Sequence, residues 1–247
     1  MGCTDMSEAG IVINNDNNEL LINATYNNLY LFRKVKLTDL PYEVLGNSSI
    51  SPLRFTLNIQ PNEIIAPIAR TDGSSLQAFS INGKGTPGST VNTWLIYVSR
   101  YISNVNDLLA DLDNVYVYTF GINTSTTTSA NGYGLQVFDE NGVCVYNSNS
   151  KPMRVLHYAN NVGDITKTDA ELDGYVCPSN RLCAIFNCAV ARRGAGAGQS
   201  RPVYFFNAYI SNSGEVKQQN TFSGGAAPFN FVMGDYIGYM VVDVTNY

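Results

Sequence analysis

The stretch GLQVFDENGVCVYNSNSKPMRVL, residues 134–156, repeats without a gap a stretch near the N-terminus. A shift of 124 positions places it on GIVINNDNNELLINATYNNLYLF, residues 10–32. Apolar and turn residues fall on residues of the same kind: Gly10 on Gly134, Ile11 on Leu135, Ile13 on Val137, Asn15 on Asp139, Asp16 on Glu140, Asn17 on Asn141, Leu21 on Val145 and Asn23 on Asn147. Because repeats decide architecture, and this spacing is half the chain, the sequence predicts a tandem duplication.

A second match, at the ends of the two units, extends the duplication. The segment DYIGYMVV from Asp235 falls on DNVYVYTF from Asp113 after a shift of 122 positions. Between the units, residues 123–131 read NTSTTTSAN, a Ser/Thr run without large apolar side chains that is typical of a linker. We therefore predict a first domain at residues 1–122, a linker at 123–133 and a second domain at 134–247.

The composition indicates a β-rich protein. Hydrophobic residues make up 45% of the chain and charged residues only 14%, against about 25% charged residues in typical soluble domains. Long solvated helices need Glu, Lys and Arg, whereas uncharged polar residues and Tyr suit sheets that face other protein. The predicted fold is all-β, with two tandem, duplicated β-sandwich-like domains joined by the Ser/Thr-rich linker.

Local patterns place strands and turns along both units. Asn14 to Asn18 supply turn chemistry between apolar residues, because Asn and Asp tolerate the left-handed backbone of a tight turn, and this predicts a hairpin. Residues 53–59 alternate apolar and polar side chains, the period of a strand with one buried face. The same reasoning predicts helical character at 104–112, a turn at Asn82-Gly83, loops at 41–52 and 164–173, and further strands at 29–35, 93–101, 115–120, 182–190, 203–210, 229–233 and 236–244.

Several classes of protein are disfavoured by charge and by missing segments. A net charge of -5 gives no basic face for nucleic acid. The sequence has no apolar run of the length that a signal peptide or a membrane-spanning helix requires, so we expect a chain made in a cytoplasm, without a membrane partner. Its five cysteines are an odd number, which indicates buried thiols in a reducing compartment rather than a disulfide framework.

No residue set in the sequence predicts catalysis. His157 is the single histidine, and no acidic or nucleophilic partner can be placed beside it from sequence. Nucleophile-elbow, zinc-protease, P-loop and dinucleotide motifs do not occur. Cys177, Cys183 and Cys188 with His157 are too loosely spaced for a structural zinc site. We therefore expect neither an enzyme nor a metal or cofactor protein.

Binding through aromatic and basic side chains remains the functional expectation. Tyr116 and Tyr118 occupy alternating strand positions, and Tyr is amphipathic and enriched at interfaces. Arg192, Arg193 and Arg201 surround a glycine-rich loop and form a basic cluster suited to an acidic partner surface. These five residues are the candidate binding residues.

The motif from Gly134, G-L-x-V-F-D-x-x-G, resembles the opening of small tail-associated structural proteins of tailed double-stranded DNA bacteriophages. An aromatic–Asn–Ser step at 146–148 and a basic–apolar finish at 154–156 complete it. The first copy departs from it, with Asn14, Asn18 and Ile22 in place of Phe138, Gly142 and Tyr146. The resemblance implies a virion component of the tail tip or tail-fibre attachment, made in the host cytoplasm and contacting other virion proteins.

Two tandem domains also suggest an oligomer. A trimer of such chains presents six similar sites and would bridge three-fold and six-fold layers of a particle, so we expect a homo-oligomer, a trimer with a pseudo-six-fold arrangement. One alternative is a decoration protein on the capsid. Another is a carbohydrate- or receptor-binding β module, in which exposed Tyr and Trp94 stack on sugar rings.

Overall fold

The computed structural model describes residues 13–14, 20–22, 28–44, 53–75, 79–84, 92–98, 104–122, 135–139, 142, 144–162, 171–189, 191–194, 203–222, 231–233 and 237–247. Within these residues the chain forms antiparallel sheets and a short α-helix, so the predicted all-β class is confirmed. The predicted linker at 123–133 lies outside the described residues.

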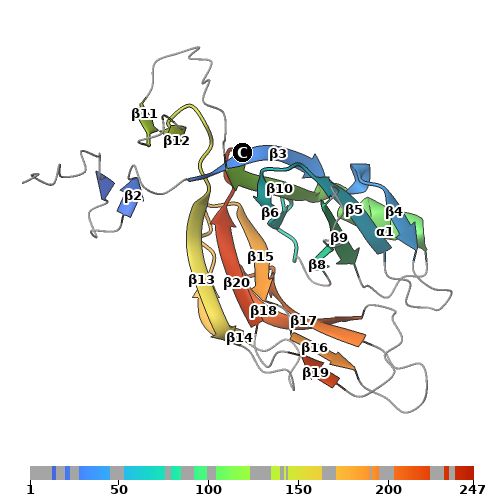
Figure 1. Cartoon of the computed structure of the whole chain (residues 1–247). Coiled ribbons are helices and arrows are strands. Elements are labelled where there is room, and N and C mark those ends of the chain that lie inside the picture. The colour runs from blue at the N-terminus through green and yellow to red at the C-terminus, as the bar shows by residue number, and fades with distance from the viewer. Residues whose placement is uncertain are drawn as a thin grey trace, which may run out of the picture.

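The largest sheet has seven strands and draws on both halves of the chain (Figure 1). Its strands follow the order β13-β20-β15-β7-β10-β3, and β6 also pairs with β10. Neighbouring strands are antiparallel throughout. The strands are β3 (Leu29–Lys36), β6 (Glu63–Ile65), β7 (Ile68–Arg70), β10 (Val115–Ile122), β13 (Arg154–Val162), β15 (Cys183–Ala189) and β20 (Ile237–Asp243).

Two smaller sheets each belong to one half. The first half forms a four-stranded sheet in the order β4-β5-β9-β8, and the second a five-stranded sheet in the order β14-β18-β17-β16-β19. Their strands are β4 (Tyr42–Val44), β5 (Leu53–Ile59), β8 (Phe79–Lys84), β9 (Asn92–Val98), β14 (Glu171–Val176), β16 (Ala191–Gly194), β17 (Val203–Ile210), β18 (Glu215–Phe222) and β19 (Phe231–Met233).

Both predicted hairpins are confirmed as two-stranded sheets. They consist of β1 (Ile13–Asn14) with β2 (Leu20–Ile22), and β11 (Gln136–Phe138) with β12 (Cys144–Asn147). Figure 1 shows the β11–β12 hairpin standing off the main body. Gly142, between β11 and β12, has a φ of 77°, which is a left-handed conformation that glycine adopts without steric cost.

The predicted helical segment is α1 (Val105–Asp111). The side chain of Asn104 caps it by accepting a hydrogen bond from the backbone N–H of Asn106 at 2.9 Å. Two 3-10 turns, Leu37–Asp39 and Leu112–Asn114, complete the helical structure of the described residues. None of these elements has the length and apolar character that a membrane crossing needs.

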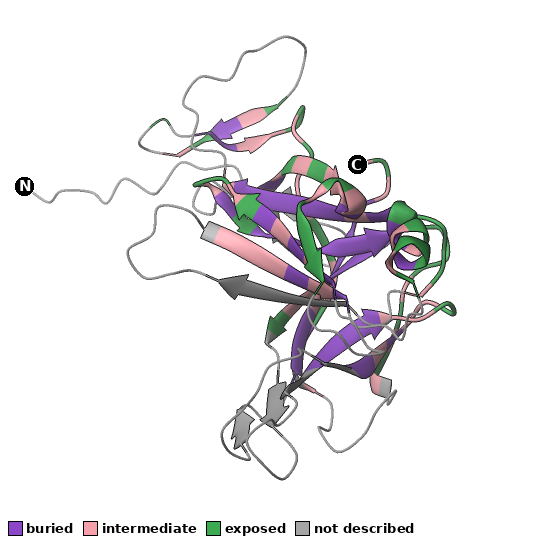
Figure 2. Ribbon diagram, turned by 90° about the vertical axis from the view of Figure 1, so that its right-hand side faces the viewer, coloured by how far each residue is buried: buried purple, intermediate pink, exposed green. Residues whose placement is uncertain are grey.

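One apolar core joins the three larger sheets (Figure 2). It combines Phe55 of the four-stranded sheet, Val117 and Tyr239 of the large sheet, and Phe206 of the five-stranded sheet. Both smaller sheets therefore share one core with the large sheet, in a sandwich-like arrangement. A second buried cluster contains alternate residues of the large sheet, Ile65, Ala69, Tyr118, Phe120, Ala184 and Val242, together with Val244 just after β20.

Strands of the two halves meet at the centre of the large sheet. Ile68 of β7 lies opposite Ile185 of β15. The ring of Trp94 in the first half stacks on Phe186 in the second, with ring centroids 5.7 Å apart. The halves thus share a sheet and a core, while the predicted domain limits at 1–122 and 134–247 stay predictions.

Three local predictions were wrong. Strand β4 lies inside the predicted loop at 41–52, and β14 begins inside the loop at 164–173. The predicted turn at Asn82-Gly83 is part of β8, where these residues pair with β9. In each case pairing with a neighbouring strand outweighs the local turn preference, because strand stability depends on partners distant in sequence.

Candidate functional site

The candidate site lies where the edges of two sheets come together. Strand β13 is the first strand of the large sheet, and β14 is the first strand of the five-stranded sheet. We call these two strands the β13–β14 edge. An edge strand presents backbone N–H and C=O groups that can pair with another chain, so this side of the molecule has two such strands.

A polar cluster ties the β13–β14 edge together. His157 Nε2 of β13 lies 2.6 Å from Asp173 Oδ2 of β14. The hydroxyl of Tyr239, on β20, donates to Asp173 Oδ1 at 2.5 Å, and the backbone N–H of Tyr175 donates to the same oxygen at 3.2 Å. The imidazole of His157 also stacks on the ring of Tyr175, with centroids 4.2 Å apart.

These contacts set the ionisation of the carboxyl group. Burial alone would raise the pKa of Asp173, but hydrogen bonds from Tyr239, His157 and the backbone of Tyr175 outweigh it and lower that pKa. Burial, together with the neighbouring carboxylate, raises the pKa of Tyr239. The cluster therefore holds an ionised Asp173 beside a neutral phenol at neutral pH.

Chemically, the cluster is a brace between sheets. Each carboxylate oxygen of Asp173 has a hydrogen-bond partner on another strand. These partners are His157 on β13 and Tyr239 on β20. Among the described residues, no hydroxyl or thiol nucleophile contacts the ring nitrogens of His157. The arrangement orients β13 against β14 and leaves their outward faces available.

Those outward faces carry apolar side chains. Val155 and Tyr158 on β13 are 47% and 54% exposed, and Val176 on β14 is 52% exposed. Single exposed apolar residues are common on protein surfaces, whereas a group of them suggests a contact surface. Val155 and Tyr158 lie opposite Val242 and Met240, on one face of the large sheet, whereas Val176 lies opposite Glu215 on the five-stranded sheet. The apolar pair on β13 is therefore the candidate contact surface of the β13–β14 edge.

The predicted aromatic binding residues lie elsewhere, on β10. Tyr118 is completely buried, and its hydroxyl has no hydrogen-bond partner among the described residues. Burial raises the pKa of Tyr118 to about 12. Tyr116 is half-buried, and the ammonium of Lys34 lies 4.7 Å from the centroid of its ring. Their binding role stays a prediction.

The predicted basic residues lie in the five-stranded sheet. Arg192 and Arg193 are on β16, where they pair with both β17 and β19. Arg201 lies outside the described residues. The tyrosines and the arginines therefore belong to different sheets, and the binding role of the arginines also stays a prediction.

The cysteines differ in exposure. Cys144 and Cys183 are buried, Cys177 is half-buried and Cys188 is exposed. The prediction of a buried thiol was wrong for Cys188, because the pairing of β15 with β20 is irregular between Asn187 and Ala189. In the described part of the chain, no group of His, Cys, Asp and Glu residues is arranged to hold a metal ion.

Sequence reasoning missed Asp173 and Tyr239 as partners of His157. Asp173 lies 16 positions from His157, and Tyr239 lies 66 positions from Asp173. No spacing rule links a histidine to a carboxylate on another sheet. Comparisons with protein-family models, curated proteins and solved structures found no match.

Proposed function

We propose that the chain is a structural protein of a tailed-bacteriophage virion that works through protein–protein contacts, at the tail tip or tail-fibre attachment. The observation that carries the proposal is the β13–β14 edge, with the exposed Val155 and Tyr158 on its strand β13. Adding a strand to such an edge gives affinity through backbone hydrogen bonds, and the apolar side chains add specificity.

Energetics favour an occupied edge. Burying apolar surface contributes about 25 cal/mol per Å², so covering the half-exposed side chains of Val155 and Tyr158 stabilises a complex in addition to the backbone pairing. The brace at Asp173 holds both strands in place before binding, which lowers the ordering cost of association. A rigid, partly apolar edge fits an assembly protein better than a freely soluble one.

The phage assignment within this proposal is supported by the hairpin motif at residues 134–156. Its two strands form β11 and β12, and the exposed side chains of Leu135 and Phe138 are 41% and 42% accessible. A projecting hairpin with apolar side chains suits docking on a neighbouring virion protein.

The strand order supports the proposed duplication. Read inward from each edge, the large sheet has the same order of strands. The first strand follows a two-stranded hairpin in the sequence, the second is the last strand of that half of the chain, and the third is central: β3-β10-β7 from one edge and β13-β20-β15 from the other. Val117 lies opposite Ile68, and Val241 lies opposite Ile185. The two valines are 124 positions apart, the shift that superimposes the hairpins, whereas the sequence match of the two last strands has a shift of 122.

This pseudo-two-fold order has a consequence for assembly. If the two units are copies, a trimer contains six similar units. It then presents each contact surface six times, in a pseudo-six-fold ring. Light scattering of the full chain at micromolar concentration tests the oligomer. A trimer is the expected result, and a stable monomer would contradict the oligomeric part of the proposal.

The contact role of the edge is tested by Val155→Lys in the full chain, with Val44→Lys as the matched control. Val44 is 44% exposed and lies on β4, an edge strand of another sheet. We expect Val155→Lys to weaken self-association or incorporation into particles at least tenfold, because it places a charge in the contact. Equal effects of both substitutions would contradict a role for the β13–β14 edge.

Antibody labelling of purified particles in the electron microscope tests the location. Label at the tail tip is expected. Label over the head would replace the tail assignment with that of a decoration protein, and unlabelled particles would overturn the virion role.

A further inference from the structure

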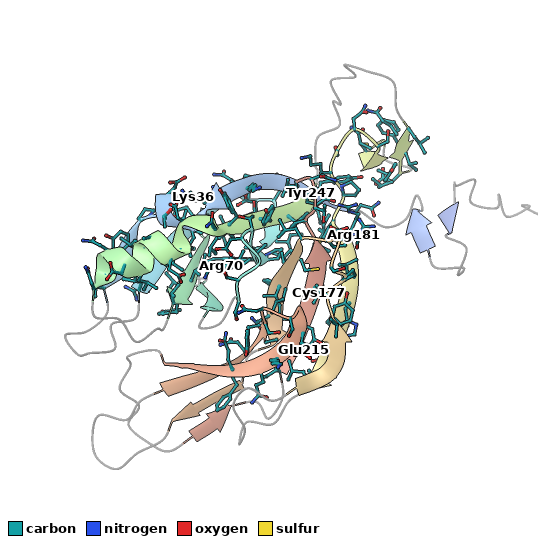
Figure 3. All side chains as sticks on the ribbon, turned by 180° about the vertical axis from the view of Figure 1, so that it is seen from behind. Lys36, Arg70, Cys177, Arg181, Glu215 and Tyr247 are labelled. Atoms are coloured by element: carbon teal, nitrogen blue, oxygen red, sulfur yellow. The ribbon has the colours of Figure 1, made fainter. Side chains whose placement is uncertain are left out.

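Four exposed cations gather around residues 243–247, at one end of the large sheet. They are Lys34 of β3, Lys151, Arg154 at the start of β13, and Arg181. Figure 3 shows Arg181 beside Tyr247 at this end. We call the four cations the basic end.

Hydrogen bonds to the backbone hold these cations in place. Lys151 Nζ donates to the carbonyl of Asn246 at 2.9 Å, and Arg154 Nη2 donates to the carbonyl of Thr245 at 3.0 Å. Both charges also lie over the ring of Tyr247, 5.5 and 5.1 Å from its centroid. Carbonyl groups and a ring orient the two cations without cancelling their charge.

Asp243 of β20 is the carboxylate that pairs with the basic end among the described residues. Its Oδ2 accepts from Arg181 Nη1 at 2.7 Å and lies 3.4 Å from Arg154 Nη2. The side chain of Asp243 is 2% exposed, whereas those of Arg154 and Arg181 are 42% and 41% exposed. The carboxylate is therefore hidden below the arginines, and the surface that a partner meets is positive.

Carboxylates gather around α1 and the two 3-10 turns. Asp39 ends the first of these turns, Asp107 lies in α1 and Asp113 lies in the second turn, and all three are exposed. The two turns contact each other. Asp113 pairs with Lys36 at 2.5 Å, whereas Asp107 has no ion-pair partner among the described residues. We call the three carboxylates the acidic end.

The two charged ends lie in opposite directions along β3. Lys34 reaches the backbone oxygen of Tyr247 at 3.2 Å, whereas Lys36, two positions later, reaches Asp113. In Figure 3, Tyr247 lies toward one end of β3, and Lys36 lies nearer to α1. One molecule therefore presents surfaces of opposite charge on opposite sides.

We propose that the basic end of one copy binds the acidic end of a second copy in a head-to-tail contact. Because the two surfaces differ, the contact is heterologous, and three such contacts can close into a ring. The inference rests on the self-association in the proposed function and names the surfaces that make it. It does not depend on where in a virion the protein lies.

The overall charge favours a second copy as the partner. The chain has 15 basic and 20 acidic side chains, and four of the basic ones lie at the basic end. The rest of the chain is therefore acidic on balance. A long polyanion such as nucleic acid would be repelled beyond the basic end, whereas a second copy presents a compact acidic surface of matching sign.

Charge reversal in the full chain tests the contact. Lys151→Glu changes the basic end and Asp107→Lys the acidic end, and neither breaks an ion pair of the described residues. In sedimentation velocity at about 50 mM salt, where charges are weakly screened, we expect each variant to weaken self-association at least tenfold. Lys217→Glu and Glu215→Lys, on β18 away from both ends, are the matched controls and should associate like the natural protein.

Rescue distinguishes a direct contact from a general loss of association. The double variant Lys151→Glu/Asp107→Lys carries a reversed charge at both ends and should regain most of the lost affinity. An equal mixture of the two single variants should also associate, because each supplies the end that the other lacks. Melting temperatures of all variants should stay close to that of the natural protein, which excludes misfolding as the cause.

Two kinds of result would overturn the inference. Self-association that withstands about 500 mM salt, or that the two variants weaken no more than the controls do, would exclude the head-to-tail contact and leave the proposed oligomer intact. Loss of association without recovery in the double variant and in the mixture would also exclude it. A natural protein that stays monomeric at low salt would overturn both this contact and the proposed oligomer.

Discussion

Ile68 and Ile185 lie opposite each other in the antiparallel strands β7 and β15, and this pair joins the two halves of the large sheet. Both side chains belong to the core that also contains Phe55 of the four-stranded sheet and Phe206 of the five-stranded sheet. Because the two halves share buried surface at this pair, a substitution that destabilises one half should also destabilise the other.

The first prediction concerns this coupling. Ile185→Ala should lower the free energy of unfolding by about 3 kcal/mol, because it leaves a cavity at a buried site. Trp94, the only tryptophan, lies in the first half, so its fluorescence should follow the same shifted transition as the circular dichroism of the whole chain.

The control for this coupling is Ile64→Ala. Ile64 is 45% exposed, and its truncation should change stability by less than about 0.5 kcal/mol. A Trp94 transition that Ile185→Ala leaves in place would instead indicate two domains that unfold independently.

A second prediction concerns the attachment of the β11–β12 hairpin. The Tyr30 hydroxyl donates to the carbonyl of Val145 at 3.0 Å and accepts from the N–H of Asn147 at 2.9 Å. Tyr30→Phe removes both bonds, so the amide of Asn147 should exchange with solvent about tenfold faster. Tyr158→Phe alters an exposed hydroxyl and is the control; equal exchange in both variants would show that Tyr30 does not hold the hairpin.

The third prediction tests the brace at the β13–β14 edge. Tyr239→Phe removes one hydrogen bond to Asp173 and leaves its burial in place, so the pKa of Asp173 should move upward. Carboxyl NMR titration measures it. Tyr175→Phe keeps the backbone N–H that bonds Asp173 and should leave that pKa nearly unchanged. A downward or absent shift in Tyr239→Phe would count against the brace.

The fourth prediction is a pH dependence from Glu63. This carboxylate is buried in β6 and accepts hydrogen bonds from Arg33 and from the hydroxyl of Thr119, each at 2.7 Å. Burial would raise the pKa of Glu63, but these donors outweigh it and lower the pKa. The stabilisation is therefore fully present above the unfolded-state pKa of about 4.3 and is lost as the pH falls through the lower folded-state value.

Glu63→Gln should accordingly cost about 2 kcal/mol at pH 7, and the difference from the natural protein should shrink below about pH 4. Denaturant unfolding at a series of pH values measures both. The control is Glu43→Gln, which breaks a surface ion pair with Arg54. It should change stability little, since exposed pairs contribute little. A Glu63→Gln deficit that persists unchanged at low pH would exclude the proposed ionic origin.

Part of the fold follows from local sequence alone. Residues 53–59 alternate in character and form β5 with the predicted bounds, because one face of the strand packs on the core and the other does not. Residues 104–112 contain the helix, since Asn104 is a strong N-cap. Strand β4 and the β8 segment at Asn82-Gly83 escaped local reasoning, because their backbone partners lie on other strands.

The candidate site depended far more on tertiary structure. The sequence by itself determined an all-β chain, its two hairpins and most of its strands, because side-chain periodicity and turn chemistry act over a few residues. Only the tertiary structure brought Asp173 and Tyr239 to His157, and Ile68 to Ile185. These contacts join strands from different sheets or halves, and their pairing is set by the packing of the whole core rather than by spacing along the chain.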